Sequence, residues 1–411
     1  MRVCVIGGGA SGMMCATMIA RKGHDVSLFE KNDKLGKKIY ITGKGRCNVT
    51  NATTGEEFLK NVVNGRKFVM GAITRFNSSD LMNFFEEVGI KLKIERGNRV
   101  FPESDKASDI TKGLERAMNW AGVKINLNSK VEKINIDDET GLAAGIVANG
   151  KNEKFDAVVV ATGGMTYPST GSTGDGYEFA KNIGHSIVEP RPALCEIIAK
   201  DKDIKGLQGL SLKNVKLVAE LENKIVYESP IGEMLFTAGG ISGPIALSAS
   251  SYITRCDIEK VKLYIDFKPA LTQDMLIERI NREIVNLKSK QFSSLLELLL
   301  PKSLSSVFAK RLKINLTTKA NQLTKENRKD LINLLKNFEI TPEKLDSFNN
   351  AVITSGGVNL KEVNPKFMNS KLVKNLYFVG EVLDIDALTG GFNLQLAFSS
   401  AVTCASAFNQ I

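Results

Sequence analysis

Residues 2–30 read RVCVIGGGASGMMCATMIARKGHDVSLFE, in which a glycine-rich turn separates an apolar run from two further apolar segments. Arg2 to Ile6 favours a strand, and Met13 to Lys22 has the composition of a helix. Asp25 to Phe29 alternates back into a second strand. Together these segments predict a βαβ unit, in which a helix connects two parallel strands of one sheet.

The glycines of this turn have the spacing of a dinucleotide-binding loop. Gly7, Gly9 and Gly12 follow the first strand, and Glu30 ends the next strand eighteen residues after Gly12. In such loops the first glycine permits the turn, the second lets backbone N–H groups approach a pyrophosphate, and the third packs helix on strand. The acid accepts hydrogen bonds from the ribose hydroxyls. The pattern predicts a bound dinucleotide rather than a merely structural turn.

Two later runs have the character of buried parallel strands. Ala157 to Val160 is continuously apolar and leads into Ala161-Thr162-Gly163-Gly164, and Leu376 to Gly380 is similar. Parallel strands that are covered on both faces read in this way. We therefore predict an α/β fold with a Rossmann-type domain, whose parallel sheet is assembled from both ends of the chain with other domains inserted between them.

The sequence between these strands changes its periodicity twice. From Pro190 to about Pro269 short segments alternate between polar and apolar residues, which predicts an antiparallel β domain, and from Thr272 to about Leu345 the spacing is helical. The boundaries that we expect are a nucleotide-binding domain over 1–190 and 355–411, a β-rich domain over 191–271 and 341–354, and a helical insert over 272–340.

Composition excludes several classes of protein. The 411 residues are 43% hydrophobic and 24% charged, which is typical of a globular protein and not of a disordered or fibrous one. Six cysteines without a C-x-x-C pair predict neither a zinc site nor a redox dithiol, so no metal site is expected and a reducing cytoplasm is the simplest location. No apolar run reaches the roughly 18–20 residues that span a bilayer. We expect a cytoplasmic protein without a membrane partner.

The net charge of +10 suggests either acidic partners or simply solubility. It is concentrated in the helical stretch from Thr272 to Leu345, which holds fourteen Lys and Arg residues against eight Asp and Glu residues.

The kind of dinucleotide is indicated near the other end of the chain. Phe378 to Glu381, Asp384 and Thr389 to Gln395 predict a strand end, a loop and a helix that begins after glycines. The N–H groups and dipole of that helix would stabilise negative charge at the N1/C2=O side of a reduced flavin. FAD enzymes need such a closure and NAD dehydrogenases lack it, so we predict FAD. The alternative is an ordinary glycine-rich loop before a core helix.

Candidate catalytic residues follow the βαβ unit. Ala52 stands where a second cysteine, five residues after Cys47, would complete a dithiol, so dithiol chemistry is not expected. Arg46 could steady a flavin phosphate or an anionic substrate. Cys47 could donate a proton or simply pack in the core, and we favour packing. Tyr167 is a second candidate acid, because it follows the end of the Ala157–Val160 strand, where open α/β sheets bind ligands.

Other polar positions have two interpretations each. Asp175 either faces the ligand or caps the next helix. The loop before Pro244 either lines the substrate side of a flavin or only starts a helix. His24 and His185 are the only histidines, and both lie in helix-to-strand turns, so we expect surface residues without a catalytic role. Acid–base chemistry would then fall to Tyr, Cys, Lys or a water held by Arg.

With these motifs in this order, the chain resembles the BaiN/YhiN-like family of bacterial NAD(P)/FAD-dependent flavoproteins over essentially its whole length. The specific matches are Gly45-Arg46-Cys47-Asn48-Val49-Thr50-Asn51 and Gly390-Gly391-Phe392-Asn393-Leu394-Gln395, beside Gly7–Gly12, Ala161–Gly164 and Ile241–Pro244. Many relatives carry His where this chain has Ala238.

The resemblance implies bound FAD in a glutathione-reductase-type domain, with an inserted β-barrel-like domain and a small helical domain. The residues expected at the cofactor are Gly7, Gly9, Ala10, Ser11, Gly12, Glu30, Lys31, Arg46, Val131, Ala161, Thr162, Gly163, Gly380, Glu381, Asp384, Gly391, Phe392 and Asn393.

The leading functional hypothesis is an NAD(P)H-dependent reductase. Relatives are linked to reduction of conjugated steroid-type double bonds, to oxidation of small aminoketones and to reduction of uracil in ribosomal RNA. We expect flavin N5 to deliver hydride to an electron-poor C=C bond of a small molecule, while an acid protonates the other carbon. No second G-x-G-x-x-G follows a strand, so NAD(P)H would bind only transiently at the flavin.

Three alternatives remain open. A structured RNA would be the partner if the basic helical stretch contacts phosphates. The residues available are Lys288, Lys290, Lys302, Lys310, Arg311, Lys313, Lys319, Arg328 and Lys329. An amine or aminoketone oxidase would form peroxide without a nicotinamide, and a non-enzymatic scaffold would hold a flavin that no donor reduces.

Overall fold

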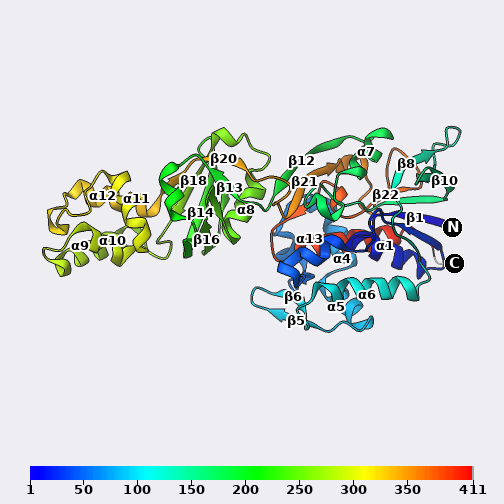
Figure 1. Ribbon diagram of the computed structural model, residues 1–411, viewed down its shortest axis with the longest axis horizontal. Coiled ribbons are helices and arrows are strands. Elements are labelled where there is room, and N and C mark those ends of the chain that lie inside the picture. Colours follow the sequence, from blue (N-terminus) through cyan, green and yellow to red (C-terminus); the bar gives the residue numbers. More distant parts are fainter. Residues whose placement is uncertain (410–411) are drawn as a thin grey trace. The chain divides into compact units, whose positions relative to one another are not determined.

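The computed structural model describes residues 1–409, which form two compact units. Within the described residues, unit 1 comprises 1–192 and 348–409, and unit 2 comprises Ala193–Ser347. Each unit has its own hydrophobic core, and Figure 1 shows unit 2 inserted into the chain between the two parts of unit 1. None of the helices in the described chain is both long and apolar enough to cross a membrane.

A five-stranded parallel sheet forms the centre of unit 1. Its order is β22 (Leu376–Phe378), β11 (Ala157–Val160), β1 (Arg2–Ile6), β2 (Asp25–Phe29) and β7 (Lys124–Asn126). All four neighbouring pairs are parallel, and β11 is buried along its whole length. The predicted Rossmann-type sheet, drawn from both ends of the chain, is confirmed.

Helix α1 (Ala10–Ala20) crosses from β1 to β2. It begins three residues earlier than the sequence suggested, because Ala10, Ser11 and Gly12 already have helical backbone geometry directly after Gly9. It packs against α13 (Phe392–Ala405) and α6 (Ala107–Trp120), which explains why α1 and α13 carry no charged side chains.

The rest of unit 1 surrounds this layer. A β-meander is made of β8 (Val131–Ile136), β9 (Ala143–Ala148) and β10 (Lys151–Lys154). A second small sheet contains β3 (Thr50–Asn51), β6 (Arg99–Pro102) and β5 (Leu92–Glu95). The remaining elements are α2 (Lys37–Ile41), α3 (Gly55–Leu59), β4 (Val62–Asn64), α4 (Arg66–Arg75), α5 (Ser78–Glu87), α7 (Asp175–Asn182), β12 (Ile187–Ala193), β21 (Ile353–Val358) and β23 (Asp386–Ala387).

Unit 2 contains an antiparallel sheet of eight strands. They are β13 (Ile197–Ala199), β14 (Ser211–Leu221), β15 (Lys224–Glu228), β16 (Gly232–Phe236), β17 (Gly240–Ser242), β18 (Val261–Asp266), β19 (Phe338–Ile340) and β20 (Pro342–Leu345). Helix α8 (Pro244–Ile253) packs on β14 and β16. The alternating pattern of Lys262 to Phe267 matches β18, whose apolar residues are buried and whose polar residues are not.

The helical part of unit 2 consists of α9 (Gln273–Leu287), α10 (Phe292–Leu299), α11 (Ser305–Leu312) and α12 (Lys325–Lys336). It shares one core with the antiparallel sheet. Phe267, Phe308 and Phe338 come from both parts, and their ring centroids lie 5.5 Å apart in each pair. The two parts are therefore held together by buried aromatic contacts.

Candidate functional site

The carboxyl ends of four parallel strands meet at one edge of the sheet in unit 1, which we call the carboxyl edge. The strand hydrogen bonds continue into the loops, since Gly7 N donates to Phe29 O at 2.8 Å and Ala161 N donates to Ile6 O at 2.8 Å. Val379 N likewise donates to Val160 O at 3.0 Å. The edge therefore consists of the loops that follow β1, β2, β11 and β22, where open α/β sheets bind their ligands.

The glycine loop is built so that a ligand can approach its backbone. Gly7 has a φ of +110°, and a Cβ there would lie 2.5 Å from Ala161 O. A Cβ on Gly12 would lie 1.9 Å from Gly7 O, whereas one on Gly9 would meet nothing within 4 Å. No side chain caps α1 at Gly9 in the described chain. The open space therefore lies at the positive end of a helix, which fits a dinucleotide pyrophosphate.

Glu30 lies beside this loop and is 8% exposed. Its Oε2 accepts a hydrogen bond from Gly8 N at 2.7 Å, and its Oε1 accepts from the amide nitrogens of Asn32, with Asn32 N at 2.9 Å. Asn32 in turn donates to Thr170 O at 3.1 Å, so it connects the loops after β2 and β11. No local pattern selects Asn32, because its role depends on a loop far away in the chain.

Lys31 pairs with Asp175 across the same two loops. Its Nζ lies 2.7 Å from Asp175 Oδ2 and 2.6 Å from Thr173 Oγ1. Burial would raise the pKa of Asp175, but the hydrogen bonds from Lys31 and Thr173 outweigh it and lower the pKa overall. Asp175 also lies in the first turn of α7, which begins after Gly174, so the helix-start interpretation agrees with its position.

The two motifs that carry the family resemblance lie against each other. Thr50 Oγ1 donates to Gln395 Oε1 at 2.6 Å, and Asn51 Nδ2 donates to Gly390 O at 3.0 Å. Gly391 has a φ of +97°, and a Cβ there would lie 2.3 Å from Thr50 O. Only glycine allows this approach of the two backbones.

Helix α13 presents its amino terminus at this junction. It has no acidic residue in its first turn and no side-chain cap on Gly391. Asn393 turns back instead, since its Oδ1 accepts from Ala387 N at 2.9 Å and its Nδ2 donates to Ala387 O at 2.7 Å. These features fit the predicted place of an isoalloxazine ring, because the helix end favours negative charge. FAD bound there would supply hydride-transfer chemistry.

Glu381 is held by groups that the sequence did not single out. Its Oε2 lies 2.7 Å from Lys38 Nζ, and its Oε1 accepts from Thr354 N at 2.8 Å. Lys38 Nζ also donates to the buried Thr166 Oγ1 at 2.7 Å. Nothing in the sequence distinguishes Lys38 from its lysine neighbours, so only the fold reveals it.

The predicted catalytic residues have different surroundings. Cys47 is fully buried, and burial raises the pKa of its thiol to about 12, so its position favours packing. The Arg46 guanidinium is ion-paired with both Glu95 and Asp105 and lies 4.2 Å from the ring centroid of Phe101. Those two carboxylates already balance the charge that Arg46 would offer to a phosphate.

Tyr167 is half-buried and has a φ of +53°. This backbone conformation is rare for an aromatic residue. It is held by a hydrogen bond from Tyr167 N to Phe348 O at 3.0 Å and by one from Thr170 N to Tyr167 O at 2.8 Å.

Several other predicted cofactor residues are distributed around the carboxyl edge. Ser11 and Gly380 touch, since a Cβ on Gly380 would lie 2.4 Å from Ser11 Oγ. Val131 is the buried first residue of β8, and Asp384 is 7% exposed. Thr162 Oγ1, at the end of β11, is buried without a hydrogen-bond partner within the described chain, and it lies against α7, because a Cβ on Gly176 would be 2.1 Å from it.

The two histidines were expected on the surface, but the structure buries both. His24 and His185 are 8% and 3% exposed. Nε2 of His185 lies 2.8 Å from Ser370 Oγ, and Nδ1 lies 3.2 Å from Glu362 Oε2. The turn that carries His185 is covered by the chain segment before β22, a long-range contact that local sequence does not reveal.

Comparisons with known proteins identify the family. The family model described as HI0933-like protein Rossmann domain matches residues 1–407. The chain belongs to this family. The resemblance to BaiN/YhiN-like flavoproteins is thereby confirmed.

Curated relatives match this chain along nearly its whole length. It is 31% identical to the ribosomal RNA dihydrouridine synthase of Haemophilus influenzae, over 98% of this chain and 96% of that protein. It is also 31% identical to the 3-dehydro-bile acid delta(4,6)-reductase of Clostridium scindens, over 97% of each chain.

A solved structure shows the same fold. The 3-ketosteroid-delta4-(5alpha)-dehydrogenase of Rhodococcus jostii superimposes with a TM-score of 0.53 at 14% identity, covering 98% of this chain and 96% of that one. The chain is an FAD-dependent oxidoreductase, as the sequence predicted.

Proposed function

We propose that the protein reduces an electron-poor C=C bond conjugated with a carbonyl group, with NAD(P)H as the transient electron donor. The observation that carries this proposal is the uncapped, acid-free amino terminus of α13 beside the motif of Thr50 and Asn51, where it would favour the reduced, negatively charged flavin. A dihydrouridine synthase and a delta(4,6)-reductase both act on a C=C bond next to a carbonyl, which supports this reaction class.

A conjugated steroid-type molecule is the leading substrate. Hydride addition to one carbon of such a bond leaves an enolate that an acid must protonate. We assign that acid to Tyr167, because it lies in the loop after β11 in a strained backbone conformation, whereas Cys47 is buried with a raised pKa. Because the cysteines of the described chain form no disulfide, we place the reaction in the reducing cytoplasm.

The first experiment is the visible spectrum of the purified holoprotein, followed without oxygen after addition of NADPH and then NADH. Bleaching of the flavin bands, followed by reoxidation with a 3-oxo-Δ4 steroid, supports the proposal. A flavin that stays oxidised with both donors contradicts it and favours an oxidase fed by its substrate. Tyr167→Phe should bleach normally but lose about a hundredfold in turnover, whereas Cys47→Ser should retain turnover.

A second candidate substrate is uracil within a structured RNA, and the lysines of the helical part of unit 2 favour it. Between Ile284 and Lys325 the chain has one acidic residue, Glu297. Backbone hydrogen bonds from Phe292 N to Thr318 O at 2.7 Å and from Ala320 N to Lys290 O at 2.9 Å bring the loops of Lys288 to Gln291 and of Thr317 to Ala320 together.

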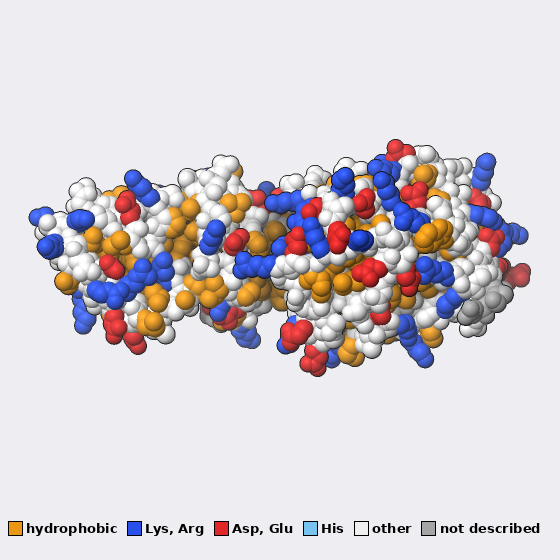
Figure 2. All heavy atoms as spheres, turned by 90° about the horizontal axis from the view of Figure 1, so that it is seen from below, with side chains coloured by type: hydrophobic (Ala, Val, Ile, Leu, Met, Phe, Trp, Pro, Cys, Tyr) orange, Lys and Arg blue, Asp and Glu red, His pale blue; other side chains and the backbone are white. Residues whose placement is uncertain are grey.

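The lysines of these loops are exposed and have no ion-pair partner among residues 1–409. They are Lys288, Lys290 and Lys319. Elsewhere in the helical part, four further lysines are also exposed and have no ion-pair partner within the described chain: Lys302, Lys310, Lys313 and Lys329. Figure 2 shows Lys and Arg side chains on this part of the surface. Free surface lysines of this kind suit phosphate contacts.

Two predicted phosphate contacts do not fit this picture. Arg311 donates to Asp203 at 2.8 Å and packs 3.8 Å from the centroid of the Phe338 ring, and Arg328 donates to Leu323 O at 3.2 Å. Both side chains serve the fold of unit 2, so we leave them out of the proposed RNA surface.

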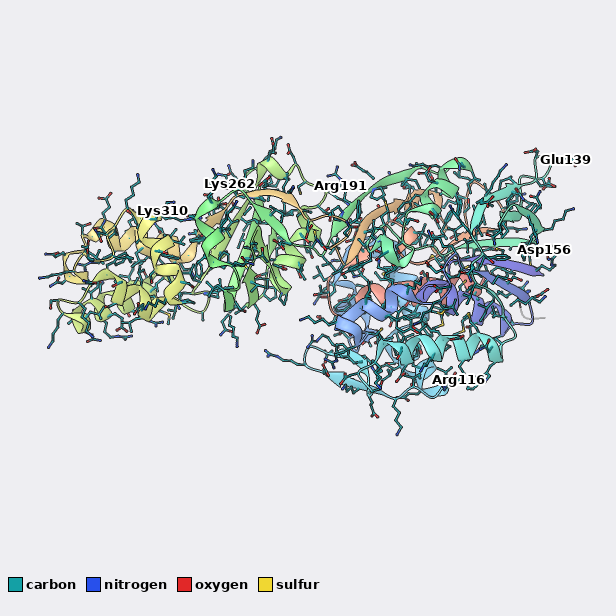
Figure 3. All side chains as sticks on the ribbon, viewed as in Figure 1. Arg116, Glu139, Asp156, Arg191, Lys262 and Lys310 are labelled. Carbon is teal, nitrogen blue, oxygen red and sulfur yellow. The ribbon has the colours of Figure 1, made fainter. Side chains whose placement is uncertain are left out.

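Charge reversal tests the RNA candidate. A triple variant with Lys288→Glu, Lys290→Glu and Lys319→Glu should no longer bind structured RNA at about 50 mM salt. NADPH should still bleach its flavin. The control is a triple variant of the antiparallel sheet with Lys213→Glu, Lys224→Glu and Lys262→Glu. It should bind RNA only slightly less well than the wild type. Figure 3 marks Lys310 on the helical part and Lys262 on the sheet. Equal losses of RNA binding in the two variants would contradict the proposed RNA surface, because net charge alone would then explain the interaction.

A further inference from the structure

The Lys38 ammonium joins three distant segments of unit 1. It lies on the short helix α2 and donates to Glu381 Oε2, in the loop after β22, at 2.7 Å. It also donates to Thr166 Oγ1, in the loop after β11, at 2.7 Å. The side chains of Lys38 and Glu381 are 23% and 22% exposed, so the ion pair is largely removed from solvent. Such a pair is stable only with good geometry and further hydrogen bonds.

The Glu381 carboxylate is fixed on both of its oxygens. Thr354 N donates to Oε1 at 2.8 Å, while Lys38 occupies Oε2. Thr166 also bonds to the chain directly before β21, because its hydroxyl donates to Val352 O at 3.3 Å. A Cβ on Gly164 would lie 3.2 Å from the Glu381 carboxyl carbon, so the chain after β11 leaves little room for another orientation.

The neighbouring lysine of the same segment is different. Lys34 is exposed, and its Nζ lies 3.9 Å from the centroid of the Tyr40 ring. It contacts neither the loop after β11 nor the loop after β22 among the described residues. An exposed lysine of this kind contributes little to a distant site.

We infer that Lys38 is a positioning residue, which orients the Glu381 carboxylate and so shapes the carboxyl edge for FAD. The inference rests on the proposed assignment of Glu381 to the cofactor site. Without the ammonium, the largely buried carboxylate would lose the partner of its Oε2, and the side chain would turn away from its present position. The effect reaches the cofactor through Glu381, because Glu381 and Thr166 already engage two of the three N–H donors of Lys38.

The test measures FAD binding to apoprotein and does not depend on turnover. Lys38→Met should raise the dissociation constant for FAD about tenfold or more, measured by quenching of flavin fluorescence. Lys38→Arg, which keeps the charge, should recover most of the affinity. Lys34→Met is the matched control and should bind FAD like the wild type. The thermal midpoint of each apoprotein, measured in parallel, reports any general loss of the fold.

A double-mutant cycle separates positioning from a merely structural role. In a Glu381→Gln background the effect of Lys38→Met on the FAD dissociation constant should shrink to less than about twofold, because the two residues act as one unit. Equal FAD affinity of Lys38→Met and wild type, or an undiminished effect in the Glu381→Gln background, overturns the inference. Failure of wild-type apoprotein to bind FAD would instead overturn the proposed function.

Discussion

Gly9 and Gly12 are three residues apart and meet opposite requirements. The space beyond Gly9 is open, and its backbone is extended, with φ −84° and ψ −170°, so a side chain is sterically possible there. Gly12 faces the carbonyl of Gly7, so any side chain collides with the backbone. One glycine therefore serves the ligand and the other serves the fold.

This difference predicts two distinct phenotypes. Gly9→Ala should leave the free energy of unfolding of the apoprotein within about 0.5 kcal/mol of wild type, because the loss of a favoured glycine before the helix is offset by the lower entropy of the unfolded alanine chain. It should weaken FAD binding about tenfold. Gly12→Ala should lower the free energy of unfolding by about 2 kcal/mol or more. Urea unfolding and FAD titration of both apoproteins check this. The interpretation is wrong if Gly9→Ala unfolds as easily as Gly12→Ala.

The buried His185 makes stability depend on pH. Burial lowers the pKa of His185, and the nearby Glu362 opposes this only in part. The unfolded chain therefore takes up a proton near the ordinary pKa of about 6.5, which the folded state does not accept until a lower pH. The free energy of unfolding then falls as the pH decreases through about 6.5. His185→Gln should flatten the fall in unfolding free energy between about pH 7 and pH 5. Parallel curves for variant and wild type would show that His185 does not contribute.

At this scale the sequence predicts residues whose position follows from a local pattern. Gly7, Gly12 and Glu30 lie where the fingerprint predicted, because a strand, a turn and a helix fix their positions within one βαβ unit. Lys38 and Asn32 were missed, since each acts through a partner more than a hundred residues away. No local periodicity encodes such contacts.

At the scale of elements, α13 is fixed at both ends. Its amino terminus lies against Thr50, and its carboxyl terminus is held by Lys22, whose Nζ donates to Ala405 O at 2.8 Å and to Phe408 O at 2.7 Å. A cation at the carboxyl end of a helix also interacts favourably with the helix dipole.

Removal of this lysine should loosen the helix. Lys22→Met should lower the free energy of unfolding by about 2 kcal/mol, because two hydrogen bonds from a charged donor are lost. Lys67→Met, at an exposed lysine of α4, is the control and should change stability by less than about 0.5 kcal/mol. Equal unfolding midpoints in urea for wild type and Lys22→Met would refute the role of Lys22.

Elements were predictable where periodicity was strong. The buried strands β1, β11 and β22 were identified from continuous apolar runs, since a strand covered on both faces needs them. Strand β7, with the sequence Lys124-Ile125-Asn126, was not, because three residues at the sheet edge carry no periodic pattern. Its place comes from pairing with β2.

At the scale of the whole molecule, unit 2 is one continuous stretch with its own core. The chain enters it after β12 and leaves it before β21, and these two strands pair with each other. A Cβ on Gly356 would lie 2.4 Å from Glu189 O, which shows how closely they approach. The two crossing points of the chain are thus held together within unit 1.

Unit 1 should therefore survive excision of unit 2. A chain in which a short Gly/Ser linker replaces residues 194–346 should still bind FAD, with a dissociation constant within about tenfold of wild type, because the carboxyl edge comes from unit 1 alone. FAD titration and circular dichroism of the shortened protein test this. A shortened chain that folds but does not bind FAD would show that unit 2 contributes to the cofactor site.

The order of segments along the chain has a consequence for biosynthesis. Strand β22 and helix α13 follow unit 2 in the sequence, and both are needed to finish the sheet and its cofactor edge. A ribosome therefore releases unit 2, which can fold on emergence, while the amino-terminal strands β1, β2 and β11 still await their last neighbour. The nascent chain must keep an apolar sheet that has four of its five strands, and an uncovered edge at β11, protected through the synthesis of more than two hundred residues. Cofactor loading is accordingly a late event, and chaperone demand should be greatest while unit 2 is being translated.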